Sequence, residues 1–359
     1  GKVIYQKSFG NHTYESNQKV SNTDVYDIAS LTKIVATLPN VMQEFDQGHL
    51  TLETKLKTML PEAKNSNKAN ATVLDMLTHQ ARFQPWIPFY KATLDSLNRP
   101  STHFYRTEFS DDFPIHVADR LYLRKDYNDT IINTILRSDL LPKKQYKYSD
   151  FTFILFKEYL ELHSKKSLEE LAHTNFFEPL GANSIMYNPL RKMNSNRIIP
   201  TENDTYFRHQ LVQGYVHDMA AAMQGGISGH AGLFANALDV AKVMQMYLQK
   251  GSYGGRTYIS ENTFNMFNTC YFCKDGNRRG VGFDKPQLGN EGPTCGCVSL
   301  TSFGHTGFTG TMTWADPEKE IVYVFLSNRT YPDSNAANKL SKENIRENIQ
   351  KVIYEAIVE

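Results

Sequence analysis

The sequence predicts an α+β protein in which strands from both ends of the chain form a sheet and a long helical segment is inserted between them. Strand-like alternation opens the chain at residues 2–10, and helical patterns separated by polar loops fill most of residues 31–225. Strand patterns return after about residue 275 and a helix closes the chain. Because strands and helices do not alternate as βαβ units, a doubly wound parallel sheet is not expected.

Length and composition point to a globular protein of about two domains. The chain has 359 residues, and a typical domain has about 150. We expect residues 1–27 together with about 275–359 to form the sheet domain, and about 28–274 to form a mostly helical one. Hydrophobic residues make up 40% of the chain and charged residues 21%, which excludes a disordered protein.

The charge and hydropathy patterns exclude two classes of partner. The formal net charge is +1, so the chain has no overall field that would collect nucleic acid or anionic lipid. The most apolar stretches, residues 151–156 and 321–326, are far shorter than the roughly 20 residues that span a bilayer. We therefore expect no nucleic-acid partner and no membrane span.

The expected elements follow from periodicity and from turn residues. The opening strand has no earlier strand beside it, so we expect its partner strand, and a first helix, upstream of this chain. Apolar residues from Ile34 to Phe45 recur at helical spacing, with Pro39 expected to kink the helix and Gly48 to end it. Thr72 is expected to cap a short helix. The remaining expected elements are helices at 151–162, 238–248 and 342–357, strands at 280–283, 310–314 and 321–327, and a turn at 316–319.

Four cysteines lie close together in the sequence, at Cys270, Cys273, Cys295 and Cys297. Their spacing fits two disulfides in an exported protein, and it also fits a four-thiolate zinc site. A zinc ribbon would more often show two C-x2-C pairs, whereas the second pair here is C-x-C. The spacing alone does not choose between the two.

Ser30 and Lys33 match the pattern S-x-x-K at the start of an apolar helix. Residues three apart on a helix share one face, with Cβ atoms about 5–6 Å apart, so this lysine lies beside the hydroxyl. A serine becomes a good nucleophile when a base accepts its proton, and the Ser30 N–H in the first turn can supply half of an oxyanion hole. A second match, at Ser16 and Lys19, lies in a polar run and is interpreted as chance. The alternative for Ser30 is a surface serine with a solvated lysine.

Two further segments carry side chains that can take part in such chemistry. Tyr148 lies three residues before the start of an expected apolar helix, and its phenol can relay a proton if Lys33 lies nearby. His305 opens a segment with glycines that leads into a strand, and the Phe308 N–H can complete the oxyanion hole. Taken singly, Tyr148 is also consistent with an interface aromatic, and His305 is better explained as a structural histidine.

In combination, these motifs resemble those of the serine β-lactamase and penicillin-binding protein superfamily. The family patterns S-x-x-K, Y-S-N/D and K/H-T-G match at Ser30, Tyr148 and His305 in that order, and the separations resemble those of the class C branch. The resemblance implies a β-lactamase/transpeptidase-like fold, an antiparallel sheet flanked by helices, with the active site in the cleft between it and the inserted helical domain. It implies that Ser30 forms an acyl-enzyme, that Lys33 and Tyr148 move protons, and that no cofactor takes part.

Two departures from the family pattern concern substrate binding. The resemblance implies that Asp150, His305, Thr306 and Gly307 contact the substrate. His305 stands where most β-lactamases carry a lysine that helps bind the substrate carboxylate, and Asp150 replaces the usual amide. Both weaken an assignment to β-lactams, while a D,D-peptidase, an esterase or an amidase remains compatible.

The part of the chain after residue 145 also resembles the serine-hydrolase modules fused to family 3 glycoside hydrolases in exported bacterial proteins, notably at residues 215–218, 229–234 and 302–311. This implies a protein of the periplasm or cell envelope and a glycoside hydrolase domain upstream. We interpret His217, Asp218 and His230 as residues that order loops near the cleft. Trp86, Phe89 and Tyr90 are expected either to line the substrate entrance or to pack in the core.

The leading hypothesis is a serine acyl hydrolase, D,D-peptidase-like or β-lactamase-like, that acts on a peptide, amide or ester in peptidoglycan metabolism. The alternatives are a carboxylesterase, a binding module that kept the fold and lost turnover, and a zinc-organised protein in which the four cysteines carry the activity. The presence of Ser30, Lys33 and Tyr148 together argues against the binding module.

Overall fold

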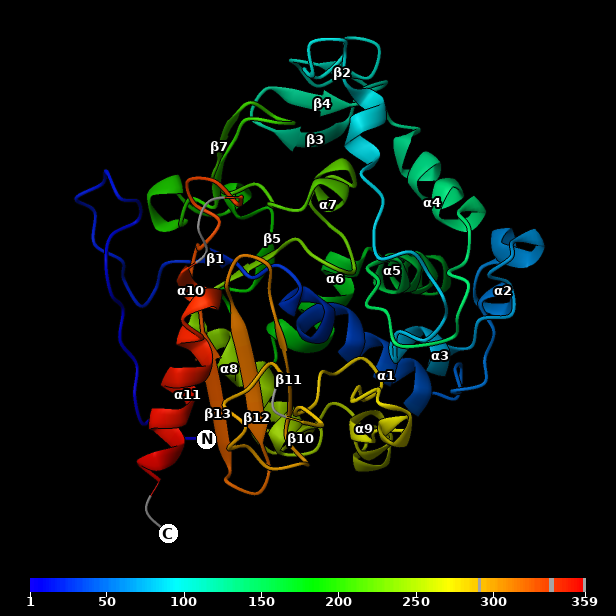
Figure 1. Ribbon diagram of the computed structural model, residues 1–359. Helices are drawn as coiled ribbons and strands as arrows, with labels where there is room; N and C mark the ends of the chain where they lie inside the picture. Colours follow the sequence, from blue (N-terminus) through cyan, green and yellow to red (C-terminus); the bar gives the residue numbers. More distant parts are fainter. Residues whose placement is uncertain (290–291, 336–338, 358–359) are drawn as a thin grey trace.

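The computed structural model describes residues 1–289, 292–335 and 339–357. Three of its strands form an antiparallel sheet near the C-terminus (Figure 1). The strands are β11 (Phe303–Thr306), β12 (Met312–Asp316) and β13 (Ile321–Phe325), hydrogen-bonded in that order. An α+β fold with an antiparallel sheet flanked by helices is confirmed.

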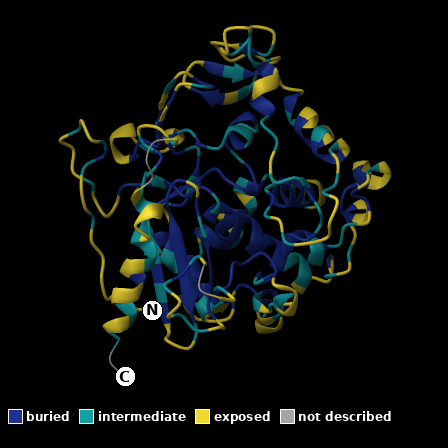
Figure 2. Cartoon of the chain, in the orientation of Figure 1, coloured by how far each residue is buried: buried dark blue, intermediate teal, exposed yellow. Residues whose placement is uncertain are grey.

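Helices cover both faces of this sheet. Every residue of β12 is buried, and its side chains alternate between two layers. Met312 and Trp314 pack with Ile353 of α11 (Ile345–Glu355), whereas Ala315 belongs to the main hydrophobic core. Helix α8 (Ala237–Leu248) packs against β12 and β13. Figure 2 shows the sheet as a buried layer.

The helix expected after Ser30 is confirmed. It consists of a π-helical turn, η1 (Lys33–Thr37), that continues into α1 (Leu38–Asp46). Pro39 has no N–H for the helical hydrogen bond to the preceding turn, and the wide π turn lies directly before it. Gly48 follows the last turn with a φ of 76°.

The other expected helices also form. The Thr72 hydroxyl accepts a hydrogen bond of 3.1 Å from the Asp75 N–H and caps α3 (Val73–Leu77). Helix α5 (Phe151–Ser164) starts directly after Asp150. The remaining helical elements are α2 (Leu56–Met59), η2 (Pro61–Asn65), η3 (Phe89–Thr93), α4 (Tyr127–Arg137), α6 (Leu168–Ala172), η4 (His173–Phe177), η5 (Pro189–Arg191), η6 (Ser195–Arg197), α7 (Met219–Met223), α9 (Glu261–Asn268), η7 (Cys273–Asp275) and α10 (Lys339–Lys342).

Short strands that the sequence patterns did not indicate lie between the helices. In the first small sheet, β1 (Tyr26–Asp27) pairs with β8 (Leu233–Ala235), which also pairs with β5 (Met186–Tyr187). This pairing positions the segment that leads into Ser30. The others are β2 (Tyr105–Arg106), β4 (Leu121–Leu123) and β3 (Ile115–Ala118) in one sheet, β6 (Glu202–Asp204) with β7 (Gln210–Val212), and β9 (Ser252–Tyr253) with β10 (Arg256–Thr257).

Two predicted strands are wrong. Residues 1–9 form no strand, and Ile4 is 76% exposed, because none of the described residues forms a neighbouring strand that would supply ladder hydrogen bonds. Residues 280–283 bend instead of extending. Gly282 has a φ of 88°, where only a residue without a side chain fits against Leu38, and pairing is limited to an isolated bridge between Asp284 and Gly304.

The predicted division into two domains remains a prediction. Helix α8 belongs to the middle segment by sequence and yet packs on the C-terminal sheet, and one hydrophobic cluster contains residues from both segments. Among the described residues, no helix combines the length and the apolar character that crossing a membrane requires.

Candidate active site

Ser30 lies at the junction between β1 and the helix that contains Lys33. Ala29, directly before it, has a φ of 48°, an unusual backbone conformation for a residue with a side chain. The Ala29 N–H donates to the buried Asp27 carboxylate at 2.8 Å, which holds this turn. The tight turn places Ser30 at the start of the helix.

The structure brings Ser30, Lys33 and Tyr148 together. The Lys33 ammonium donates to Ser30 Oγ at 2.9 Å, and the Tyr148 hydroxyl donates to the same oxygen at 3.2 Å. Lys33 and Tyr148 are 115 residues apart in the sequence, and they meet because α5 packs against η1. This arrangement places two proton-transfer groups within hydrogen-bond distance of a potential nucleophile.

Lys33 is fully buried and is surrounded by polar partners. Besides Ser30, its ammonium donates to the His230 carbonyl at 3.0 Å and forms an ion pair with Asp150 at 2.7 Å. Burial disfavours the charged form, but the negative charge of Asp150 and the contact with Tyr148 outweigh it, so the pKa of Lys33 is raised. Lys33 is therefore a cation at neutral pH.

Tyr148 is also protonated in the resting site. Burial raises the pKa of its phenol, and the charge of Asp150 adds to this, while the Lys33 cation opposes it. Ser30, Lys33 and Tyr148 therefore all carry their protons at neutral pH. A base that can accept the Ser30 proton therefore exists only after the group formed by Ser30, Lys33 and Tyr148 has lost one proton.

Asp150 contacts Lys33 directly, and its side chain is 24% exposed. The carboxylate is thus part of the charge balance around Ser30. A contact with substrate, as the resemblance implies, stays a prediction.

The backbone N–H groups of Ser30 and Phe308, which the sequence analysis assigned to an oxyanion hole, have no bonded acceptor among the described residues. The turn that contains Phe308 is tied to the segment before Ser30, because Thr309 donates to the Asp27 carbonyl at 2.8 Å and Thr311 to the Ile28 carbonyl at 3.1 Å. The role of both N–H groups in an oxyanion hole remains a prediction.

His305 and its neighbours lie at the end of β11 next to this turn. His305 Nδ1 lies 2.7 Å from the Thr306 carbonyl, which can only accept, so this nitrogen carries the proton. Burial, with the charges of Arg279 and Lys33, lowers the pKa of His305 to about 3, so the ring is neutral. A side chain on Gly307 would collide with Thr311 and with the Ile28 carbonyl. Substrate contacts of His305, Thr306 and Gly307 stay predictions.

The four cysteines lie outside this site and form two disulfides, Cys270–Cys273 and Cys295–Cys297. All four sulfurs are bonded to one another in pairs, so they offer no thiolates to a metal ion. The zinc alternative for these cysteines is therefore wrong in this structure. The disulfide alternative holds.

Comparison with known proteins agrees with the motifs. Residues 1–344 match the protein family described as Beta-lactamase. The chain belongs to this family. A curated relative named "Putative D-alanyl-D-alanine carboxypeptidase" from Escherichia coli (strain K12) is 28% identical over 377 residues, which is 97% of this chain and 80% of the relative. Another, named N-acetylmuramyl-L-alanine amidase, from Bacillus subtilis (strain 168), is 27% identical and covers 92% of this chain and 75% of its own length.

Solved structures of similar proteins support the fold of this Beta-lactamase family member. The octameric penicillin-binding protein homologue from Pyrococcus abyssi has a TM-score of 0.63 at 21% identity and covers 96% of this chain and 71% of its own. The hydrolase EstCE1, described as having promiscuous acyltransferase activity, has a TM-score of 0.68 at 16% identity. The match covers 98% of this chain and 91% of EstCE1. At these identities the comparison shows the fold alone. The chain is a serine hydrolase of the Beta-lactamase family.

Sequence reasoning missed Arg279, a buried cation next to Tyr148. Its guanidinium carbon lies 5.3 Å from the centre of the Tyr148 ring, and its Nε and Nη1 have no hydrogen-bond partner among the described residues. Arg278 binds Asp284 through two contacts of 2.9 and 3.0 Å, and Arg279 reaches the same carboxylate at 3.4 Å. Because Arg278 and Arg279 carry two positive charges and Asp284 carries one negative charge, one net positive charge remains beside Tyr148. A pair of arginines before a glycine gives no sequence signal for this role.

His230 and Asp218 lie near the site, as the sequence interpretation expected. His230 Nε2 lies 2.8 Å from Asp218 Oδ1. Burial raises the pKa of the Asp218 carboxyl, but the interaction with His230 lowers it by more, so the pKa of Asp218 is lowered overall. Both residues line a small pocket beside Asp150, and so do the aromatic residues that the sequence analysis placed either at the substrate entrance or in the core, Trp86, Phe89 and Tyr90. Since the His230 carbonyl accepts from Lys33, this pair helps to hold the lysine.

Proposed function

We propose that the protein forms an acyl-enzyme on Ser30 and hydrolyses a peptide, amide or ester in the manner of a D,D-peptidase. The observation that carries the proposal is the convergence of the Lys33 ammonium and the Tyr148 hydroxyl on Ser30 Oγ, at 2.9 and 3.2 Å. A serine oxygen with two buried proton-transfer groups beside it is the arrangement that nucleophilic catalysis needs.

Acylation starts from the form of the site that has lost one proton. Ser30 Oγ attacks the substrate carbonyl while its proton passes to the basic atom of the Lys33 and Tyr148 pair. The carbonyl oxygen becomes negative and takes hydrogen bonds from the N–H groups of Ser30 and Phe308. When the intermediate collapses, the bond to the leaving group breaks, and the leaving amine or alkoxide takes that same proton from the pair.

Deacylation repeats these steps with water. The pair accepts a proton from the water molecule as its oxygen attacks the acyl carbonyl, and it returns the proton to Ser30 Oγ as the ester bond breaks. The site then regains its starting protonation, so no external oxidant, metal or cofactor enters the balance.

Support for a peptidoglycan substrate comes from the relatives. One is named for carboxypeptidase action on D-alanyl-D-alanine and another for amidase action on N-acetylmuramyl-L-alanine, both bonds of the bacterial cell wall. The two disulfides are consistent with an oxidising compartment, which supports the proposal of an exported protein of the periplasm or cell envelope. The glycoside hydrolase domain upstream remains a prediction.

A carboxylesterase is the second candidate, because His305 is neutral. A neutral imidazole attracts a substrate carboxylate less than a lysine does. Substrates without a carboxylate therefore lose little binding free energy at this position.

One set of assays separates these candidates. Release of D-alanine from an N-acylated D-alanyl-D-alanine peptide is measured next to hydrolysis of a p-nitrophenyl ester, each with Ser30→Ala as the blank. We expect D-alanine release above the blank. Hydrolysis of the ester alone favours the carboxylesterase, and no turnover of either by the native chain overturns the assignment as an acyl hydrolase.

Removing the Tyr148 hydroxyl is expected to slow acylation without unfolding the site. In Tyr148→Phe the ring still packs, but Ser30 loses one of two proton-transfer groups, so kcat/KM is expected to fall by about 10²- to 10⁴-fold. The measurement is ester hydrolysis at fixed pH. Tyr5→Phe, at a 70% exposed tyrosine, is the matched control and should leave the rate unchanged. A Tyr148→Phe enzyme with native activity contradicts this role.

Asp150→Asn is expected to shift the pH dependence of activity. The Asp150 charge raises the pKa of both Lys33 and Tyr148, and catalysis requires this pair to lose a proton. Without the charge, the proton leaves more easily, so the rising limb of the kcat/KM profile should move to lower pH by about one unit.

The control for this shift is Asp129→Asn, which changes an exposed carboxylate without a partner among the described residues. Its pH profile should match that of the native chain. A shift of the Asp150→Asn limb to higher pH would mean that Asp150 assists proton removal, contrary to the charge balance described above.

A further inference from the structure

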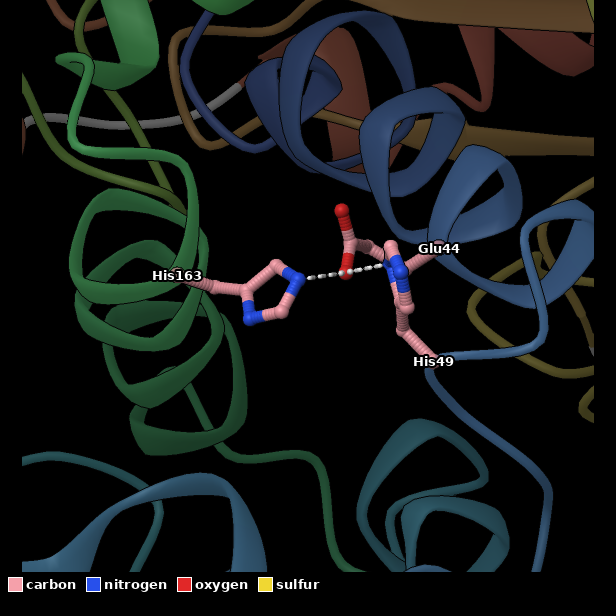
Figure 3. A group of neighbouring side chains, drawn as sticks. All are labelled: Glu44, His49 and His163. Carbon is pink, nitrogen blue, oxygen red and sulfur yellow. Dashed lines mark hydrogen bonds and ion pairs between the residues drawn. The ribbon is translucent and has the colours of Figure 1, made fainter.

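Three side chains that can bind a metal ion converge on the surface, away from Ser30. Glu44 lies on α1, His163 on α5, and His49 on the loop after α1 (Figure 3). We propose that these residues bind one transition-metal ion of the Zn²⁺ type. The site is separate from the four cysteines, which are paired in disulfides.

The distances between the ligand atoms fit a tetrahedral ion. Glu44 Oε2 lies 3.2 Å from His49 Nδ1 and 3.5 Å from His163 Nε2, and all three atoms lie within 4.8 Å of one another. Zinc binds nitrogen and oxygen at about 2.0–2.2 Å, and at those bond lengths the corners of a tetrahedron are about 3.3–3.6 Å apart. The two shorter separations therefore need little adjustment to accept the ion.

The donor set selects the class of metal. Two imidazoles and one carboxylate suit zinc and its neighbours in the first transition row, whereas Mg²⁺ and Ca²⁺ prefer sites made of oxygen atoms. Three protein ligands leave a fourth position for water. The hollow next to the cluster is lined by polar side chains that can bind that water, namely Asn40, Gln43, Gln47 and Asn175.

The surrounding residues hold the ligands in place. Tyr159 donates its hydroxyl to Glu44 Oε2 at 2.9 Å, and its ring stacks on His163 with an angle of 17° between the planes. Glu44 is only 12% exposed, while His49 and His163 are 42% and 43% exposed and open to an incoming ion. Such support of the ligands by a second layer of residues is typical of metal sites.

The position of the cluster suggests a structural effect. Helix α1 continues the helix that begins after Ser30, and α5 begins directly after Asp150. His163 lies 13 residues beyond Asp150, about 20 Å along the helix axis. An ion bound near the C-terminal ends of α1 and α5 would link the two helices that follow the catalytic motifs, and it would stabilise the folded state by mass action.

The test is zinc binding by the full chain without an affinity tag. Calorimetric titration of chelator-treated protein should give one Zn²⁺ per chain, and Mg²⁺ should give no comparable binding. His49→Ala and His163→Ala should each weaken zinc binding by at least about 10-fold. His173→Ala, at an exposed histidine in η4, is the matched control and should bind like the native chain.

Two further measurements keep the outcome clear. Bound Co²⁺ should give the intense visible absorption of a tetrahedral site in the native chain and not in the variants, whose folding is checked by circular dichroism. Zinc should raise the melting temperature of the native chain and of His173→Ala only. The proposal is overturned if the native chain binds no zinc, or if the double variant of His49 and His163 binds it equally well; the three side chains then form only a hydrogen-bonded cluster.

Discussion

Ser30→Ala is expected to reduce kcat/KM by about 10⁴-fold or more, the largest effect of any single substitution in this chain. The reason is that the acyl group then has no oxygen to bond to, while the oxyanion donors and the binding surface remain. The loss of one hydroxyl at a partly buried position leaves the packing intact, so the melting temperature should change little.

The chain offers a matched control for this experiment. Ser16 and Lys19 repeat the S-x-x-K pattern, but Ser16 Oγ only accepts the N–H of Gln18 in a surface loop. Ser16→Ala should therefore keep native activity. Turnover in Ser30→Ala above about one tenth of the native rate would contradict the assignment of Ser30.

Lys33→Met is expected to lower kcat/KM by roughly 10³-fold. Methionine fills the buried volume, but it removes the ammonium that donates to Ser30, to the His230 carbonyl and to Asp150. Loss of proton transfer accounts for about 10²- to 10⁴-fold. The Asp150 charge then also faces Tyr148 without its counter-ion, which raises the pKa of the phenol further.

Ester hydrolysis over a pH series measures this effect. Lys19→Met is the control at the second S-x-x-K and should not change the rate, because Lys19 is exposed. If Lys33→Met kept native kcat/KM at every pH, Lys33 would be a structural residue and Tyr148 alone would have to serve as the base.

The parts of the site that local patterns specify could be predicted. The helix after Ser30 follows from apolar residues at helical spacing, which also places Lys33 on the face of the hydroxyl. Tyr148 and His305 were placed by the order of three motifs along the chain. In the structure, the Tyr148 hydroxyl contacts Ser30, and the ring centres of Tyr148 and His305 lie 5.9 Å apart.

Contacts between distant segments could not be predicted. The ion pair of Lys33 with Asp150 joins residues 117 positions apart, and the sequence suggested only a substrate contact for Asp150. Arg279 lies beside Tyr148 through the packing of a loop that has no periodic pattern. Charges of this kind set the protonation of a buried site, and they depend on tertiary packing rather than on local sequence.

The two strand predictions that were wrong, at residues 2–10 and 280–283, also failed because they depend on contacts between distant segments. Alternation at residues 2–10 is a signal for a strand only if another strand is available to pair with it, and the described part of the chain supplies none at this position. At residues 280–283 the glycines that looked like strand residues serve a tight bend against α1. The strand β1 could not be predicted because two residues are too few to show the alternation of a strand.

The most direct test of the central claim is to locate a covalent adduct. The native chain and Ser30→Ala are each incubated with a fluorophosphonate probe, which bonds to activated serine oxygens, and the labelled peptide is identified by mass spectrometry. We predict one adduct, on Ser30, in the native chain and none in Ser30→Ala. An adduct on another serine, or none in a folded native chain that binds its substrates, would contradict the account of Ser30 as the nucleophile.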